Sequence, residues 1–345
     1  MPQGILPNSK SALPSRRQIL KAASLAAGAA ATSAPIPTFG VAPAKAAAYP
    51  ERPVKIIVPF AAAGPTDIMA RILAQSLGTA LGGNFIVENK PGAGGNIGIG
   101  YAAHAEADGY TLLVVSTAYV VNPGLYAKIP YDPYKDLAPI TELGTTPNSI
   151  LVTPKFGVNS IPELIARAKA KPGELNWASP GAGTTPHLSG EFLRTVGGIE
   201  MTHVPFNGAA PAIQALLAGT TQVAVSALPP VLPFAQSGEI KVLAVTGEHR
   251  WPDLPDVPTM VELGYKDFVA ETAQFFFAPG KTPPDIVERL SAKAMDALKE
   301  RAVVEQLRVN GYEVTAAGAA ALRKRIEVEI PKWRDIIARA GIKPV

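Results

Sequence analysis

Apolar runs of strand length alternate with helical spacing along most of the chain. The run Val54–Val58 is followed by Asp67–Leu81, where apolar residues recur every three or four positions, as they do on one face of a helix. The same order repeats at Phe85–Glu88 and Ile97–Ala107, and the run Thr111–Ser116 follows. This rhythm predicts a parallel sheet covered by helices.

A second series begins after the segment Asn122–Leu137, whose prolines indicate a connection. Its predicted strand and helix pairs are Ile150–Thr153 with Ile161–Lys171, Leu175–Ser179 with Thr185–Val196, Met201–Val204 with Ala210–Ala218, and Gln222–Ser226 with Val231–Ser237. The strands Ile240–Thr246 and Gln274–Ala278 follow, then two long helices near Pro284–Asn310 and Ala319–Ala340. We therefore expect two α/β lobes joined by crossing strands, residues 49–149 plus 271–345 and residues 150–270, with the C-terminal helices on the first lobe.

The N-terminal 48 residues differ from this pattern. The twin arginine Arg16 and Arg17 precedes a short, alanine-rich apolar stretch and a run of small residues that ends at Ala48. These features are typical of a Tat export signal, and the alternative is a basic disordered tail. The apolar stretch is much shorter than the ~20 residues that a membrane-spanning helix needs. We predict export to the periplasm, with residues 1–48 as the Tat signal peptide.

The charge and the cysteine content of the chain argue against nucleic-acid binding, disulfide bonds and a lipid anchor. Of the 32 Lys and Arg residues, five lie in the first 48, which leaves 27 against 28 acidic residues in the rest of the chain. Residues 49–345 therefore lack the excess of positive charge with which proteins bind the phosphates of nucleic acid. The chain has no cysteine, hence neither a disulfide framework nor a lipid-anchoring cysteine. We expect a free, monomeric protein that binds no nucleic acid.

Four connections after predicted strands consist mostly of small residues and contain no Lys or Arg. They are VPFAAAGPTD at 58–67, STA at 116–118, SPGAGTT at 179–185 and PFNGAA at 205–210. In open α/β sheets, ligands bind beyond the carboxyl ends of strands, where unpaired amides at helix N-termini attract anions without a cationic side chain. The alternative is that these are ordinary turns whose Ser, Thr and Asp residues cap helices. Asp67 has the least certain role, since it would repel a carboxylate unless it bonds elsewhere.

Several longer motifs resemble one family. They are PERPVKIIVPF at 50–60 with GPTD, VENKPGAGGNIG at 87–98, DGYTLL at 108–113, HVPFNG at 203–208 and LPDVPT at 254–259. In order and spacing they resemble the Bug-type substrate-binding proteins of tripartite tricarboxylate transporters. The resemblance runs from about Tyr49 to the C-terminus. It implies a type II-like periplasmic binding protein fold, in which two lobes close on hinge strands around a small organic carboxylate destined for the membrane subunits of such a transporter.

The same resemblance implies the ligand-binding residues. The first lobe would contribute Phe60, Ala61, Ala63, Thr66 and Asp67, with Ser116 and Thr117 beside them. The second lobe would contribute Ser179, Gly181, Thr184, Thr185, Phe206, Asn207, Gly208 and Ala209. The sequence departs from the usual pattern at Ala63 (glycine), Phe206 (tyrosine), Ser226 (aspartate) and near Ala273 (tryptophan). We expect these differences to alter the distal part of the pocket, which selects among acids.

The sequence gives little support for a dinucleotide site, a hydrolase site or a metal site. The stretch Gly92–Ile97 resembles a dinucleotide fingerprint, but Ile97 stands where glycine or alanine is required, so we interpret it as a turn and helix start. Neither a G-x-S-x-G nucleophile elbow nor an H-E-x-x-H metal motif occurs, and the four histidines are scattered along the chain. His187 follows a ligand loop, but a packing or capping role fits it better. We predict no cofactor, no metal and no catalytic residue.

Three functional hypotheses remain. The first is a periplasmic binding protein that delivers an organic acid to a transporter. The second is an extracytoplasmic sensor that reports the same acid to a receptor kinase. The third, an enzyme of the periplasm, is disfavoured because no nucleophile, base and orienting residue can be named together. The sequence does not separate the first two.

Overall fold

The first sheet forms from the N-terminal and C-terminal parts of the chain. The computed structural model describes residues 49–266 and 268–339, so the predicted signal peptide lies outside the described residues. Strand β1 (Val54–Val58) pairs in parallel with β2 (Phe85–Asn89) and β3 (Thr111–Ser116). Strand β9 (Glu271–Pro279) lies antiparallel between β3 and β4 (Leu137–Val152), and β10 (Glu313–Gly318) also pairs with β4.

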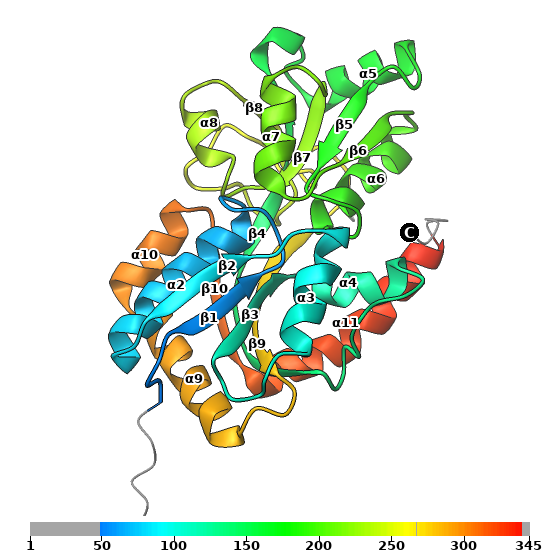
Figure 1. Ribbon diagram of the computed structural model, residues 1–345. Helices are drawn as coiled ribbons and strands as arrows, with labels where there is room; N and C mark the ends of the chain where they lie inside the picture. Colours follow the sequence, from blue (N-terminus) through cyan, green and yellow to red (C-terminus); the bar gives the residue numbers. More distant parts are fainter. Residues whose placement is uncertain (1–48, 267, 340–345) are drawn as a thin grey trace, which may run out of the picture. The chain divides into compact units, whose positions relative to one another are not determined.

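The second sheet continues from the end of β4. Strand β5 (Asn176–Ser179) pairs in parallel with β6 (Thr202–Pro205) and β7 (Val223–Ala227), while β7 and β8 (Lys241–Val245) pair antiparallel with residues 148–152 of β4. Strand β4 therefore belongs to both sheets, and Figure 1 shows it passing from one group of elements into the other. The predicted α/β class with crossing strands is confirmed.

Helices connect the strands and cover the sheets. They are α2 (Pro65–Leu81), α3 (Asn96–Ala103), α4 (Ala118–Leu125), α5 (Ile161–Ala170), α6 (Thr185–Gly197), α7 (Ala209–Leu217), α8 (Leu232–Gln236), α9 (Pro284–Ala297), α10 (Arg301–Val309) and α11 (Ala319–Arg339), with 3-10 helices at Ala93–Gly95 and Pro154–Phe156. Helix α9 packs on α2 and α11 packs on α4, which confirms that the C-terminal helices return to the first sheet. The stretch Gly92–Ile97 forms the predicted turn and helix start.

Local sequence explains where several helices begin and end. Ser160 precedes α5, and its hydroxyl accepts a hydrogen bond from the Glu163 amide, as an N-cap residue does. Helix α2 ends at Gly82, whose φ of 66° lies in the left-handed region that glycine enters without steric penalty. The apolar strand β1 is buried between β2 and β3 because helices cover both faces of a parallel sheet.

Three element predictions were wrong. Residues 122–137 were expected to be a connection, but α4 continues through Pro123 to Leu125. Strand β4 begins at Leu137 rather than Ile150, because β-bulges between Pro139 and Thr141 and between Glu142 and Gly144 accommodate residues that usually break strands. The long helix expected over Pro284–Asn310 is two helices, and strand β10 separates them from α11.

Two apolar cores hold the two sheets. One surrounds the first sheet and includes Phe275, Phe276 and Phe277 of β9, all fully buried. A second lies around Trp177 of β5, between the second sheet and helices α5 and α6. Within residues 49–266 and 268–339, no helix combines the length and the apolar character needed to cross a membrane.

Candidate functional site: a cavity at three helix N-termini

Three helices start at one small cavity of about 20 Å³. Its lining includes Pro65 and Thr66 from the start of α2, Thr184 to Pro186 from the start of α6, and Gly208 and Ala209 from the start of α7. Neither Gly64 nor Gly208, the N-cap residues of α2 and α7, offers a side-chain acceptor to the first amides. Unpaired amides and the positive ends of three helix dipoles therefore lie near one place.

Seven of the fifteen residues expected to bind ligand line this cavity. They are Phe60, Thr66, Ser116, Thr184, Thr185, Gly208 and Ala209. Every lining side chain is uncharged, and four of these seven carry a hydroxyl group. The cavity thus combines main-chain amides and hydroxyls, which are hydrogen-bond donors that suit an anion.

The other eight expected residues lie beside or behind the lining. They are Ala61, Ala63, Asp67, Thr117, Ser179, Gly181, Phe206 and Asn207. Several of them hold the loops in place. The Ala273 amide donates to the Thr117 hydroxyl at 2.8 Å, and the Gly181 amide donates to the Ser179 hydroxyl at 3.2 Å. Phe206 packs against the apolar cluster around Ile213 and Leu216.

Five lining residues were missed by the sequence analysis: Pro65, Pro180, Pro186, Ala227 and Thr272. Thr272 is the most informative, because it belongs to a buried polar network at the crossing strands. Its hydroxyl pairs with that of Thr185 and donates to Asn148 Oδ1 at 2.8 Å. The Asn148 amide donates in turn to the Ser189 hydroxyl at 3.0 Å. The sequence analysis named the region near Ala273 as a departure from the family pattern but did not include Thr272 among the ligand-binding residues.

Asp67 is occupied by groups of its own lobe. The carboxylate accepts hydrogen bonds from the Ala63 amide at 2.9 Å and from Asn89 Nδ2 at 2.9 Å, and it pairs with Arg71 at 2.8 Å. Burial alone would raise the pKa of Asp67, but the hydrogen bonds from Arg71, Asn89 and Ala63 together lower it. Asp67 therefore stays ionised, stabilises the loop before α2, and leaves Arg71 paired rather than free for a ligand.

The two halves of the site touch one another. The Ala61 amide donates to the Asn207 carbonyl at 3.2 Å, and the Tyr126 hydroxyl donates to the Ala182 carbonyl at 3.2 Å. A Cβ placed on Gly94 would lie 2.3 Å from the Ala182 carbonyl oxygen. A cavity of 20 Å³ has room for about one water molecule. This arrangement of the loops is closed.

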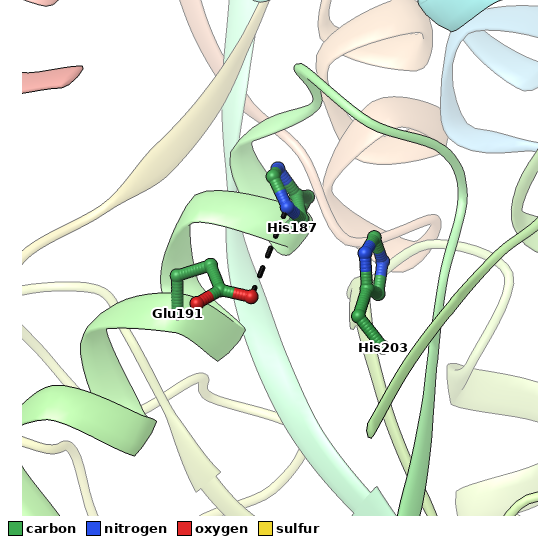
Figure 2. A group of neighbouring side chains, drawn as sticks. All are labelled: His187, Glu191 and His203. Atoms are coloured by element: carbon green, nitrogen blue, oxygen red, sulfur yellow. Dashed lines mark ion pairs between the residues drawn. The ribbon is translucent and has the colours of Figure 1, made fainter. Parts of the chain in front are cut away.

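Two histidines that are distant in sequence meet behind the ligand loop of the second sheet, so the expectation that the histidines are scattered is wrong for this pair. The rings of His187 and His203 stack with centroids 4.5 Å apart, and both also stack on Trp177. Figure 2 shows the His187 ring facing Glu191, whose carboxylate lies 4.0 Å from His187 Nε2. Candidate metal-ligating atoms of His187, Glu191 and His203 lie within 4.8 Å of one another.

The geometry of this cluster favours packing over metal binding. The lone pair of an imidazole nitrogen lies in the plane of its ring, so two stacked rings do not aim their lone pairs at one point. The nitrogens also have other partners. Ser179 Oγ lies 2.7 Å from His203 Nε2, and the Gly183 amide donates to His187 Nδ1 at 3.4 Å. Both contacts hold the loop at residues 179–185 that lines the cavity.

The histidine pair predicts an acid-labile fold. Burial lowers the pKa of His187 to about 4, with a contribution from Arg194, and burial and then His187 lower that of His203 to about 3. His187 Nδ1 must be unprotonated to accept the hydrogen bond from the Gly183 amide, and burial favours the neutral form of both rings. The unfolded chain therefore binds more protons below its histidine pKa of about 6.5. We expect stability to fall from pH 7 to pH 5, by on the order of 2 kcal/mol for His187 alone.

Urea unfolding at several pH values measures this effect. The variant His187→Gln should have a shallower decline over the same interval, because it removes one of the two groups that titrate. A decline identical to that of the unmodified protein would contradict the assignment.

A larger cavity, of about 880 Å³, lies on the other face of the crossing strands. Side chains alternate along a strand, and Thr272 of β9 faces the small cavity while its neighbour Glu271 lines the large one. The large cavity contains Glu248, Glu271 and Glu313 and none of the fifteen expected residues. Burial, followed by the charges of Glu313 and Glu248, raises the pKa of Glu271. The lining also includes Arg250 and Arg308, whose guanidinium groups are paired with nearby carboxylates. Size alone therefore does not identify the site.

Comparisons with known proteins agree with this geometry. Residues 69–342 match the family described as the tripartite tricarboxylate transporter family receptor, TctC. The chain is 35% identical to the periplasmic binding protein BugD, with a TM-score of 0.83, covering 86% of this chain and all of that one. It is 34% identical to Rpa4515 of R. palustris, solved with adipate (TM-score 0.83, 86% and 100% coverage). It is 31% identical to MatC of Rhodopseudomonas palustris, solved with malate (TM-score 0.79, 84% and 100% coverage).

The resemblance inferred from the motifs and the type II-like periplasmic binding protein fold are therefore both confirmed. The matched segment includes the starts of α6 and α7 and the whole of β9, three of the elements that build the small cavity. The chain belongs to the TctC family of tripartite tricarboxylate transporter receptors, which includes Bug-type periplasmic solute-binding proteins.

Proposed function

We propose that this protein captures a small organic carboxylate in the periplasm and delivers it to the membrane subunits of a tripartite tricarboxylate-type transporter. The observation that carries the proposal is the convergence of the α2, α6 and α7 N-termini on a cavity lined by uncharged residues. The adipate and malate in the two similar structures support the same class of ligand.

The binding residues are the fifteen inferred from the resemblance, together with Thr272. The lobes would be residues 49–149 plus 271–345 and residues 150–270, and they would separate by bending at β4 and β9. The protein would act as a monomer after Tat export directed by residues 1–48. The same closed site would serve a sensor, and loss of uptake when the gene is deleted distinguishes transport from sensing.

Main-chain donors suffice for useful affinity. A hydrogen bond to a charged carboxylate contributes about 1.5–3 kcal/mol net. Four or five such bonds, shared between the lobes, reach the roughly −8.2 kcal/mol that corresponds to a micromolar dissociation constant. Because these donors lie on both lobes, the bound acid favours the closed arrangement and stabilises it.

A calorimetric and thermal-shift screen tests the proposal. We expect adipate, malate or another short dicarboxylate to bind in the micromolar range and to raise the melting temperature. Amines and neutral sugars of similar size serve as controls and should leave it unchanged. Turnover of a bound acid, or binding confined to the amines and sugars, would contradict the proposal.

A further inference from the structure

Gln274 of β9 is a buried amide without a hydrogen-bond partner. Its side chain is 0% exposed, and neither Nε2 nor Oε1 has a partner among the described residues. Buried side-chain amides are nearly always hydrogen-bonded, because an unpaired one has lost its water without compensation. An exception on a strand that also contributes Thr272 to the cavity lining points to a partner that arrives from outside the protein.

The strand register places Gln274 on the cavity face of β9. Residues two apart on a strand share a face, and Thr272, which lines the cavity, is two residues before Gln274. Ser116 of β3 is directly opposite Gln274 in the antiparallel pair. Residues opposite one another also share a face, and Ser116 lines the cavity as well. Two independent neighbours therefore place this amide beneath the same cavity.

The chemistry of an amide restricts what it can recognise. Nε2 donates hydrogen bonds and Oε1 accepts them, so the group pairs with a carboxylate, a hydroxyl or a carbonyl, and pairs poorly with a methyl group. The helix N-termini supply donors for one carboxylate in the proposed function. Gln274 lies on β9 beside two lining residues: Ser116 is its register partner on β3, and Thr272 is two residues earlier on the same strand.

We propose that Gln274 is a specificity-determining residue, which binds the second polar group of a short dicarboxylate or hydroxy acid. This inference rests on the proposed function, because it assigns the far end of the same guest. If Gln274 has this role, the site prefers acids that have a hydrogen-bonding group at each end. A monocarboxylate with an alkyl tail would leave the buried amide unpaired, and such unpaired groups are what reject an analogue.

Calorimetry with adipate and hexanoate, which differ in one terminal carboxylate, tests the proposal in the full chain and in Gln274→Met. The unmodified protein should bind adipate at least about tenfold more tightly than hexanoate. The variant should lose about tenfold or more of its adipate affinity while its hexanoate affinity changes less than about threefold. The pair 4-hydroxybutyrate and butyrate repeats the test for a hydroxyl group, because only the first carries a second hydrogen-bonding end.

Stability without ligand provides a second readout. Methionine has nearly the volume of glutamine and no orphaned amide, so Gln274→Met should melt at the same temperature as the unmodified protein or about 2 °C higher. The matched control is Thr282→Val, since Thr282 Oγ1 is also buried and unpartnered but Thr282 lies outside β9, the strand that contributes Thr272 to the cavity. That control should leave adipate affinity unchanged.

The results separate the role of Gln274 from the proposed function. Equal losses for adipate and hexanoate, or no loss, would overturn the role of Gln274 while leaving carboxylate capture intact. A marked fall in the melting temperature of Gln274→Met would mean that the amide has a structural partner, and would overturn it too. If none of the four acids binds, the proposed function fails, and this inference fails with it.

Discussion

Substituting valine for Gly208 is expected to weaken adipate or malate binding at least about a hundredfold, or about 2.8 kcal/mol. Gly208 precedes α7 and lines the cavity. A Cβ at this position would lie 2.8 Å from the Cβ and 3.0 Å from the amide nitrogen of Ala61, on the opposite lobe. The Ala61 amide donates to Asn207, so the collision falls on the contact that closes the site. Calorimetry of the purified variant measures the loss.

Gly219→Val is the matched control for this substitution. Gly219 follows the same helix and also has a positive φ, 78° against 137° at Gly208, but a Cβ there would meet nothing within 4 Å. Both variants strain the backbone and should lose about 1–3 kcal/mol of stability. Only Gly208→Val should lose affinity for adipate or malate. If Gly208→Val binds these acids as tightly as Gly219→Val does, the site does not close through the contact between residues 208 and 61.

Removing the Asp67 carboxylate is expected to destabilise the fold by about 2–3 kcal/mol. The variant Asp67→Ala leaves the Ala63 amide, Asn89 Nδ2 and the Arg71 guanidinium without their shared acceptor. The Arg71 side chain is 54% exposed and regains water, which keeps the loss below that of a fully buried pair. Urea unfolding at pH 7 measures the change. Ligand affinity should also fall, because these bonds hold the loop that carries Phe60 and Thr66.

The control is Glu174→Ala, which removes an exposed ion pair with Lys171. Both side chains are more than half exposed, so stability should change by less than about 0.5 kcal/mol. The sign of the pH effect is a further check. The folded pKa of Asp67 is lowered, so its stabilisation is complete above the unfolded value of about 3.8 and is lost as pH falls through the folded pKa. This window lies below that of the two histidines. Equal stability of Asp67→Ala and Glu174→Ala would contradict the role of Asp67.

The sequence was sufficient for most elements because their signals are local. Strands β1 and β3 have the bounds that the apolar runs predicted, and helices α6 and α7 begin within one residue of their predicted starts. It failed at β4, where Pro139, Gly144 and Pro147 are strand-breaking residues in a strand that bulges. Pairing with β9 and β10 supplies the stabilisation there, and such pairing joins residues more than a hundred positions apart.

Some residues of the candidate site could likewise be predicted from the sequence, and others could not. Loops of small residues without Lys or Arg were visible at strand ends in the sequence, and nine residues from these loops line one cavity. Thr272 and Gln274 gave no local signal, because a polar residue in a buried strand is meaningful only when its face is known. The meeting of His187 and His203 likewise depends on the pairing of β5 with β6, which no motif encodes.

By itself the sequence determined most of the succession of strands and helices, the absence of Lys and Arg from the ligand loops, and the family. These follow from neighbouring residues, whose spacing and chemistry are fixed by the chain. Only the tertiary structure decided that Asp67 is held by Arg71 and Asn89, that Ala61 bonds to Asn207, and that Gln274 is the register partner of Ser116. Each of these depends on contacts between distant segments, which strand register and packing alone bring together.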